Sequence, residues 1–241
     1  FVESRERPTW LVVDRSASMA FGSGQRTKAD VAAEVSAILA AAALHNRDAA
    51  GVITFRAALD VVLEPSRKAE QLERILLALQ SRSTVDSTTG SMVGEPAGVG
   101  SFDAAFDVLE RRTLRRSVLA LVSDFHDANG LARMARLAQR HDVIACVVFD
   151  PRERVLDGDG LVECVDPETG KRFVLDAGDA RERAEFAALA TADRTQRVTR
   201  LRATGADVLE VSTEHDVVER LLTYFEARAR GGSSRSQGGA R

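Results

Sequence analysis

Short runs of apolar residues alternate with amphipathic segments along most of the chain. The continuous apolar runs, which are typical of buried parallel strands, cover 9–13, 51–55, 117–123, 143–149 and 208–211. Segments with helical spacing of apolar residues begin near Lys28 and then cover 68–80, 101–111, 131–137, 181–203 and 217–228, with Thr27 and Thr213 as the expected caps of the first and last. Strands separated by helices predict a doubly wound α/β fold, in which helices cover both faces of a parallel sheet.

Two further pairs of strands follow a hairpin pattern. The run 59–63 comes only three residues after the run 51–55, which predicts an antiparallel strand at the edge of the sheet, ended by Pro65. The runs 161–165 and 171–175 flank Asp166-Pro-Glu-Thr-Gly170, which is typical of a turn. We therefore expect an inserted β-hairpin over about 158–176.

The domain boundaries follow from composition. The chain has 241 residues, of which 44% are hydrophobic and 29% charged, as in a globular domain with a substantial core. Residues 81–100 read as a long loop rich in Ser, Thr and Gly, and almost no apolar residue follows Gly231. The sequence predicts one domain over 1–230 and a disordered tail over 231–241.

Charge and cysteine content restrict the function. Lys and Arg number 33 against 36 Asp and Glu, so nothing favours a nucleic-acid partner. Cys146 and Cys164 are the only cysteines, which favours a reducing compartment without a thiolate metal cluster. No apolar stretch approaches about 18 residues, so we expect no membrane span and a cytoplasmic location. Because the sequence opens at Phe1 rather than at a methionine, membrane association through an upstream segment stays open.

Carboxylates and hydroxyls gather where two predicted strands end. Asp14, Ser16 and Ser18 follow the first apolar run, and Asp124 follows the run before the fourth helix. The carboxyl ends of parallel strands share one edge of a sheet, so these side chains are expected to converge. Their oxygen atoms suit a hard cation such as Mg²⁺, or Mn²⁺ in its place. Ser101, at the start of a predicted helix, is a further candidate ligand or a plain helix cap.

The motif Asp14-x-Ser-x-Ser18 resembles the metal-ion-dependent adhesion site of von Willebrand factor A domains. Those domains add a threonine from a second loop and an aspartate after the fourth strand. Asp124 fits the aspartate, and Ser101 stands where the threonine is expected. Further segments resemble the bacterial domain-of-unknown-function family fifty-eight, a branch of these domains, over about 2–230: Ser16–Gly24, Arg26–Ala29, Ser123–Phe125, Asp150–Glu153 and Asp166–Gly170.

This resemblance implies a six-stranded sheet in the order 3-2-1-4-5-6, with the third strand antiparallel. It also implies a protein-binding module whose metal ion accepts an acidic side chain from a partner protein. Members of this family are often encoded beside MoxR-type AAA+ ATPases, so the resemblance implies an adaptor in ATPase-driven assembly or maturation, with no catalytic residue and no cofactor besides the ion.

Two alternatives stay open beside the binding module. An aspartate after the first strand also serves as the nucleophile of phosphatase-like hydrolases, but these need a second aspartate where Ser16 stands, and no Gly-x-Ser-x-Gly elbow occurs. His126 could bind a metal or act as a base, although a loop histidine between two aspartates is more typical of a polar contact. The other alternative is a structural domain with a vestigial metal site. We expect that the protein is not an enzyme.

Overall fold

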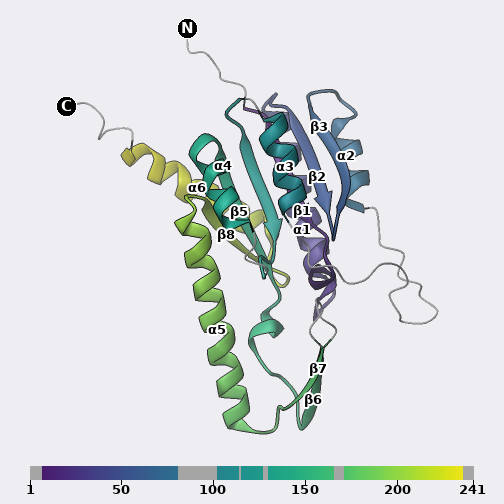
Figure 1. Ribbon diagram of the computed structural model, residues 1–241, viewed down its shortest axis with the longest axis vertical. Coiled ribbons are helices and arrows are strands. Elements are labelled where there is room, and N and C mark those ends of the chain that lie inside the picture. Colours follow the sequence, from purple (N-terminus) through teal and green to yellow (C-terminus); the bar gives the residue numbers. More distant parts are fainter. Residues whose placement is uncertain (1–6, 81–101, 114, 127–129, 166–170, 236–241) are drawn as a thin grey trace.

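A six-stranded sheet forms the centre of the protein (Figure 1). This computed structural model describes residues 7–80, 102–113, 115–126, 130–165 and 171–235, with the backbone alone for 231–235. The strands of the sheet are β1 (Thr9–Asp14), β2 (Ala50–Phe55), β3 (Leu59–Ser66), β4 (Val118–Ser123), β5 (Asp142–Phe149) and β8 (Asp207–Ser212).

The order of the strands is β3-β2-β1-β4-β5-β8. Every neighbouring pair is parallel except β2 and β3, which are antiparallel. This confirms the predicted order and the antiparallel edge strand. The expected end at Pro65 was wrong, because β3 continues to Ser66. An edge strand tolerates proline, since one side of its backbone has no ladder partner. Opposite Pro65 lies Gly51, where an added Cβ would come within 2.7 Å of the proline nitrogen.

Helices cover both faces of the sheet, as predicted. One face holds α1 (Lys28–His45), α2 (Gln71–Gln80) and α6 (Val217–Arg235), and the other holds α3 (Asp103–Arg112), α4 (Leu131–Arg140) and α5 (Ala180–Ala203). Alternate residues of each strand serve the two cores: in β1, Leu11 and Val13 pack on the first face, whereas Trp10 and Val12 pack on the second. The continuous apolar runs therefore reflect strands that are buried on both sides.

The helix ends agree with the sequence in one case and differ in another. Thr27 caps α1 in a capping box with Asp30. The expectation that Thr213 caps α6 was wrong. The carboxylate of Asp216 accepts hydrogen bonds from the backbone N–H groups of Val218 and Glu219 instead. Asp216 directly precedes the first residue of α6, which is the position that can reach those groups.

The last helix is also longer than predicted. α6 continues to Arg235, which is five residues into the segment that was expected to be disordered. Once a helix is formed, each further residue adds one backbone hydrogen bond, so the helix need not stop at its last apolar side chain. Residues 236–241 lie outside the described part of the chain. No helix within the described ranges is long and apolar enough to cross a membrane.

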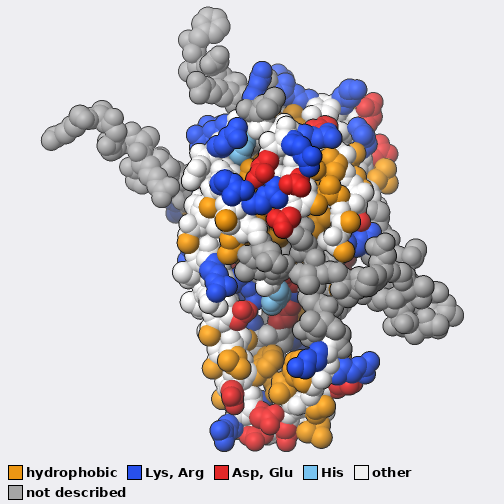
Figure 2. Space-filling view, viewed as in Figure 1, with side chains coloured by type: hydrophobic (Ala, Val, Ile, Leu, Met, Phe, Trp, Pro, Cys, Tyr) orange, Lys and Arg blue, Asp and Glu red, His pale blue; other side chains and the backbone are white. Residues whose placement is uncertain are grey.

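An arm extends beyond the carboxyl end of the sheet (Figure 1). It consists of the first half of α5 and a separate antiparallel pair, β6 (Leu161–Val165) and β7 (Arg172–Asp176), which confirms the predicted hairpin. Apolar side chains lie exposed on this arm (Figure 2), among them Leu161 (76% exposed), Val174 (58%) and Leu189 (65%). Exposed apolar surface of this kind is typical of a protein interaction site.

Candidate metal centre

The register of the sheet places Asp14 beside Ser123. Strands β1 and β4 are parallel neighbours with Val13 opposite Val122, so the next residue of each strand reaches the same edge. Ser123 Oγ donates a hydrogen bond of 2.6 Å to Asp14 Oδ2, and the backbone N–H of Ser16 donates one of 2.8 Å to Asp14 Oδ1. Both oxygens of this buried carboxylate are thus oriented by the chain around it.

A short 3-10 helix, η1 (Ala17–Ala20), follows at once and brings two hydroxyls together. Ser16 Oγ lies 3.2 Å from Ser18 Oγ, and both serines are buried. Alternate residues of a tight turn therefore present oxygen atoms on one side, as the Asp-x-Ser-x-Ser spacing predicts. Ser101, the fifth predicted ligand, lies outside the described residues.

Asp124 reaches the same edge from β4. Its side chain is buried, and its negative charge raises the pKa of Asp14, while Ser18 helps to lower the pKa of Asp124. The structure thus brings Asp14, Ser16, Ser18 and Asp124 together at the carboxyl end of the sheet. Their role as metal ligands stays a prediction.

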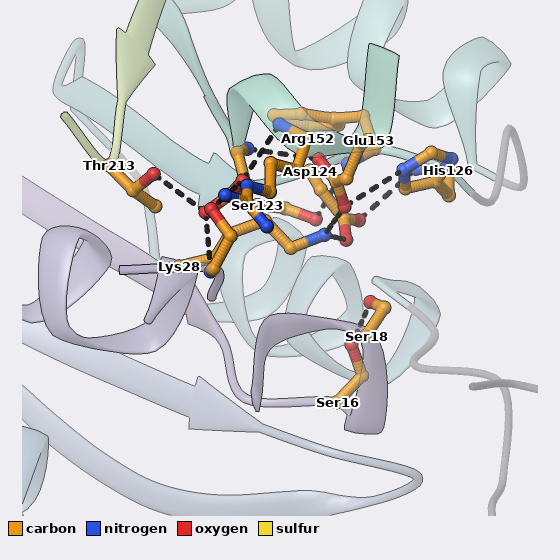
Figure 3. A network of polar contacts seen from close by, with 12 residues as sticks. Ser16, Ser18, Lys28, Ser123, Asp124, His126, Arg152, Glu153 and Thr213 are labelled. Atoms are coloured by element: carbon orange, nitrogen blue, oxygen red, sulfur yellow. Dashed lines mark hydrogen bonds and ion pairs between the residues drawn. The ribbon is translucent and has the colours of Figure 1, made fainter. Parts of the chain in front are cut away.

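Lys28 is the residue that sequence reasoning missed. Although it begins α1, it is only 1% exposed, and its Nζ donates to Asp124 Oδ2 (2.7 Å) and to Glu153 Oε1 (2.5 Å) (Figure 3). Burial favours a neutral lysine, but the two carboxylates outweigh it and raise the pKa of Lys28. Burial likewise raises the pKa of Asp124, yet Lys28 holds it below the ordinary value.

A signal for this role was present in the sequence. Lys28 is one of three lysines among 33 basic residues. In a chain so rich in arginine, a lysine directly after the loop that carries the serines is a candidate for a buried position. Such a position would fit a compact ammonium group but not a guanidinium group.

A second group of possible ligands also includes Asp124. One ligand atom from each of Asp124, His126 and Glu153 lies within 4.8 Å of the others. The ammonium of Lys28, however, already bridges Asp124 and Glu153 (Figure 3). A divalent cation at that point would have to displace a buried lysine, so the position beside Asp14 is the better candidate.

Asp14 carries a buried charge without a cationic partner among the described residues. Burial, together with the nearby Asp124, raises its pKa from 3.8 to about 6 in spite of its hydrogen bonds to Ser123 and Ser16. At neutral pH the group is therefore ionised at a cost, which a bound cation would offset. One carboxylate beside neighbouring hydroxyls is an oxygen donor set that fits Mg²⁺ or Mn²⁺.

Comparison with known proteins assigns the family. Residues 1–196 match the family described as "Protein of unknown function DUF58". The chain belongs to this family. An uncharacterised protein of Mycobacterium tuberculosis is 32% identical over 240 residues, which cover 95% of this chain and 70% of that protein. A Mycobacterium avium relative is 32% identical over 170 residues, covering 69% of this chain and 94% of that protein.

Solved structures agree on the fold of this DUF58 domain. The conserved hypothetical protein BatB from Bacteroides thetaiotaomicron superimposes with a TM-score of 0.52 at 14% identity, over 94% of this chain and 99% of that one. The VWA domain of SpRpn10 has a TM-score of 0.47 at 8% identity, over 89% and 93% of the two chains. The strand order of the DUF58 domain, with β3 antiparallel at one edge, is the order that the resemblance to von Willebrand factor A domains implies.

Asp150 fixes the loop that precedes Lys28. This aspartate is fully buried at the end of β5 and accepts hydrogen bonds from the backbone N–H (2.9 Å) and the hydroxyl (2.7 Å) of Ser23. It also accepts from the Thr213 hydroxyl (2.8 Å) and from the backbone N–H of Arg152 (2.9 Å). The backbone N–H of Asp150 in turn donates to Glu153 (3.0 Å), so one network ties this loop, β8 and η2 (Pro151–Arg154) to the lysine site.

Removal of the Asp150 carboxylate is expected to destabilise the domain. Asp150→Ala leaves several buried donors without an acceptor, which costs about 2–4 kcal/mol in the free energy of unfolding. Urea unfolding followed by circular dichroism measures the loss. Asp157→Ala, at an exposed aspartate a few residues further on, is the matched control and should stay within about 0.5 kcal/mol of the wild type. Equal stability of the two variants would show that the Asp150 network contributes nothing.

Proposed function

We propose that this DUF58 domain is a metal-dependent protein-binding module, in which Mg²⁺ or Mn²⁺ held by Asp14, Ser16 and Ser18 accepts a carboxylate from a partner protein. Asp124 would contribute through water, because its carboxylate is engaged by Lys28. The observation that carries the proposal is the buried carboxylate of Asp14, which forms no ion pair with a cationic side chain of the described ranges and lies beside two hydroxyls.

The charges around the site favour an acidic ligand. Since Lys28 offsets the charge of Asp124, Asp14 is the anionic group that would face the ion directly, together with neutral hydroxyls. A divalent ion in such surroundings keeps an excess of positive charge, so a partner's Asp or Glu side chain is the ligand that it would attract. The exposed apolar arm lies at the same end of the sheet and supplies further surface for a protein partner.

The role in the cell that we propose is that of an adaptor for a MoxR-type AAA+ ATPase, and the domain itself would not be an enzyme. The proposed partner is supported by the resemblance of the motif segments to the family. The proposed non-catalytic role is supported by the residue at position 16. Ser16 offers a hydroxyl, paired with Ser18, where a phosphatase-like enzyme needs an acid–base carboxylate.

Binding of the purified ATPase tests the proposal. The DUF58 domain, immobilised with Mg²⁺ present, should retain the MoxR-type ATPase of the same organism and release it in EDTA. Asp14→Ala should lose both the Mg²⁺ signal in calorimetry and the retention, while far-UV circular dichroism stays unchanged. Asp159→Ala, at an exposed aspartate, is the control. Retention that neither EDTA nor Asp14→Ala affects would reject a metal-dependent contact.

The affinity for Mg²⁺ is expected to fall in acid. A proton competes with the ion for Asp14, whose pKa is about 6. Between pH 7.5 and 6.5 the dissociation constant should change little, and below pH 6 it should rise about tenfold for each pH unit. Calorimetric titrations at several pH values from 7.5 to 5 provide the measurement. A dissociation constant that stays flat down to pH 5 would mean that Asp14 is not the ligand.

A further inference from the structure

A half-open pocket with an aromatic floor lies between α3, α4 and α5. Three rings form the floor: Phe102 stacks on Phe106 (ring centroids 5.4 Å apart) and on Phe125 (5.3 Å). Met134 and Leu201 complete its buried part. Its rim consists of more exposed residues: His126, Gly130, Leu131, Asp193, Gln196, Arg197 and Arg200.

This pocket shares a wall with the candidate metal centre. Phe125 directly follows Asp124 and has a φ of 53°, a left-handed conformation that is costly for an aromatic residue. Because of this backbone conformation, the two successive side chains lie in different sites. Asp124 contacts Lys28, whereas the ring of Phe125 forms part of the pocket floor. Strain of this kind persists where the surrounding structure requires it.

Arg197 makes a second connection between the two sites. From α5 it donates a hydrogen bond of 3.0 Å to the backbone carbonyl of Asp124, and a second guanidinium nitrogen lies 3.1 Å from His126 Nδ1. Arg197 thus holds the wall of the pocket against Asp124, a residue of the candidate metal centre. A ligand that fills the pocket would therefore contact residues that directly adjoin or hold Asp124.

Among the residues that the structure describes, the rim of the pocket carries more positive than negative charge. The guanidinium of Arg197 is paired with Asp193. Arg200 lies exposed at the rim, and none of the acidic side chains that the structure describes forms an ion pair with it. An apolar, aromatic floor beneath an unbalanced cation favours an apolar side chain that is flanked by negative charge.

We propose that this pocket, defined by Phe102, Phe106, Phe125, Leu131 and Arg200, selects the partner by binding a large apolar side chain next to the partner's acidic residue. This inference rests on the proposed function and adds its specificity: the partner segment carries a Glu or Asp for the ion and, a few residues away, a Phe or Leu for the pocket.

Pairs of synthetic peptides test the selection. Each fluorescent peptide carries one Glu and, one to four residues before or after it, either Phe or Ser. Fluorescence polarisation with the Mg²⁺-loaded domain should show at least one spacing at which the Phe peptide binds about tenfold more tightly than its Ser partner, as expected for burying one aromatic side chain. The absence of such a difference at every spacing, including the absence of any binding, overturns the pocket proposal.

Two pairs of variants locate the effect. Leu131→Asp places a charge in the pocket and should reduce the preference for Phe to less than about threefold, whereas Ala132→Asp, on the exposed neighbouring residue of the same helix end, should leave it intact. Arg200→Glu should weaken the binding of the Phe peptide about tenfold, and Arg202→Glu, exposed on the same helix but outside the pocket, less than twofold. Equal effects within each pair would assign the binding to another surface.

The peptides also separate this inference from the proposed function. Phe and Ser peptides that bind equally well, and both only with Mg²⁺, would leave the metal-dependent module intact and reject the pocket. A preference for Phe that persists unchanged in EDTA would locate an apolar pocket but reject its link to the ion.

Discussion

Replacing Asp14 by asparagine is expected to stabilise the metal-free domain while abolishing its response to Mg²⁺. The pKa of Asp14 is raised from 3.8 to about 6 in the folded state. Between these values the folded state holds the proton more tightly than the unfolded chain, so stability falls as the pH rises through this window. At pH 7.5 the ionised carboxylate costs about 3 kcal/mol, which the neutral amide avoids.

The substitution also preserves the local contacts. The carbonyl oxygen of asparagine can accept from the Ser16 N–H as Asp14 does, and its amide can donate to Ser123 Oγ. If Asp14 holds the ion as proposed, Mg²⁺ should bind the wild type and not the variant, so the wild type alone should gain stability with increasing Mg²⁺.

Thermal unfolding at pH 7.5 in EDTA and in 10 mM MgCl₂ measures both effects. In EDTA, Asp14→Asn should have a higher melting temperature than the wild type. Addition of Mg²⁺ should raise the melting temperature of the wild type alone, so that the difference between the two proteins becomes smaller or changes sign. Asp159→Asn, at an exposed position, controls for the loss of a charge. If Asp14→Asn were less stable than the wild type in EDTA, Asp14 would be a structural acceptor rather than a group held ready for a cation.

Replacing Lys28 by methionine is expected to destabilise the domain by about 3–5 kcal/mol, because it leaves the buried charge of Asp124 without its counter-ion. Methionine retains most of the volume of the lysine chain, so the loss reports on charge rather than on a cavity. Urea unfolding at neutral pH, followed by the fluorescence of the buried Trp10, measures it. Lys68→Met removes an exposed lysine and should change little.

A double variant tests the cause. If the ion pair is responsible, Asp124→Asn should remove much of the penalty of Lys28→Met, and the two substitutions should be far from additive. The second ion pair of Lys28, to Glu153, is partly exposed and should contribute less, because solvent screens it. Additive losses would mean that Lys28 acts through the packing of its aliphatic chain.

In the candidate site, local sequence predicts the arrangement of neighbouring residues but not the contacts between distant ones. Asp14, Ser16 and Ser18 lie within one turn, and a strand followed by that turn sets their arrangement from neighbouring residues alone. The link to Asp124 required one more step, the parallel pairing of β1 and β4, which the strand order implied by the family resemblance contains. The contacts of Lys28 had no such pattern, because its partners are 96 and 125 residues away in the chain.

The sequence by itself determined the layers of the fold, the antiparallel edge strand and the edge of the sheet at which the acidic and hydroxyl groups meet, because apolar periodicity sets which face of each element is buried. Only the tertiary structure decided how charge is distributed at that edge. The ammonium of Lys28 lies on Asp124 rather than on Asp14, Asp150 holds Ser23 and Thr213, and Phe125 turns away from the edge into an aromatic pocket. These outcomes depend on how segments distant in sequence pack against one another, and the energy of a buried charge is set by those neighbours.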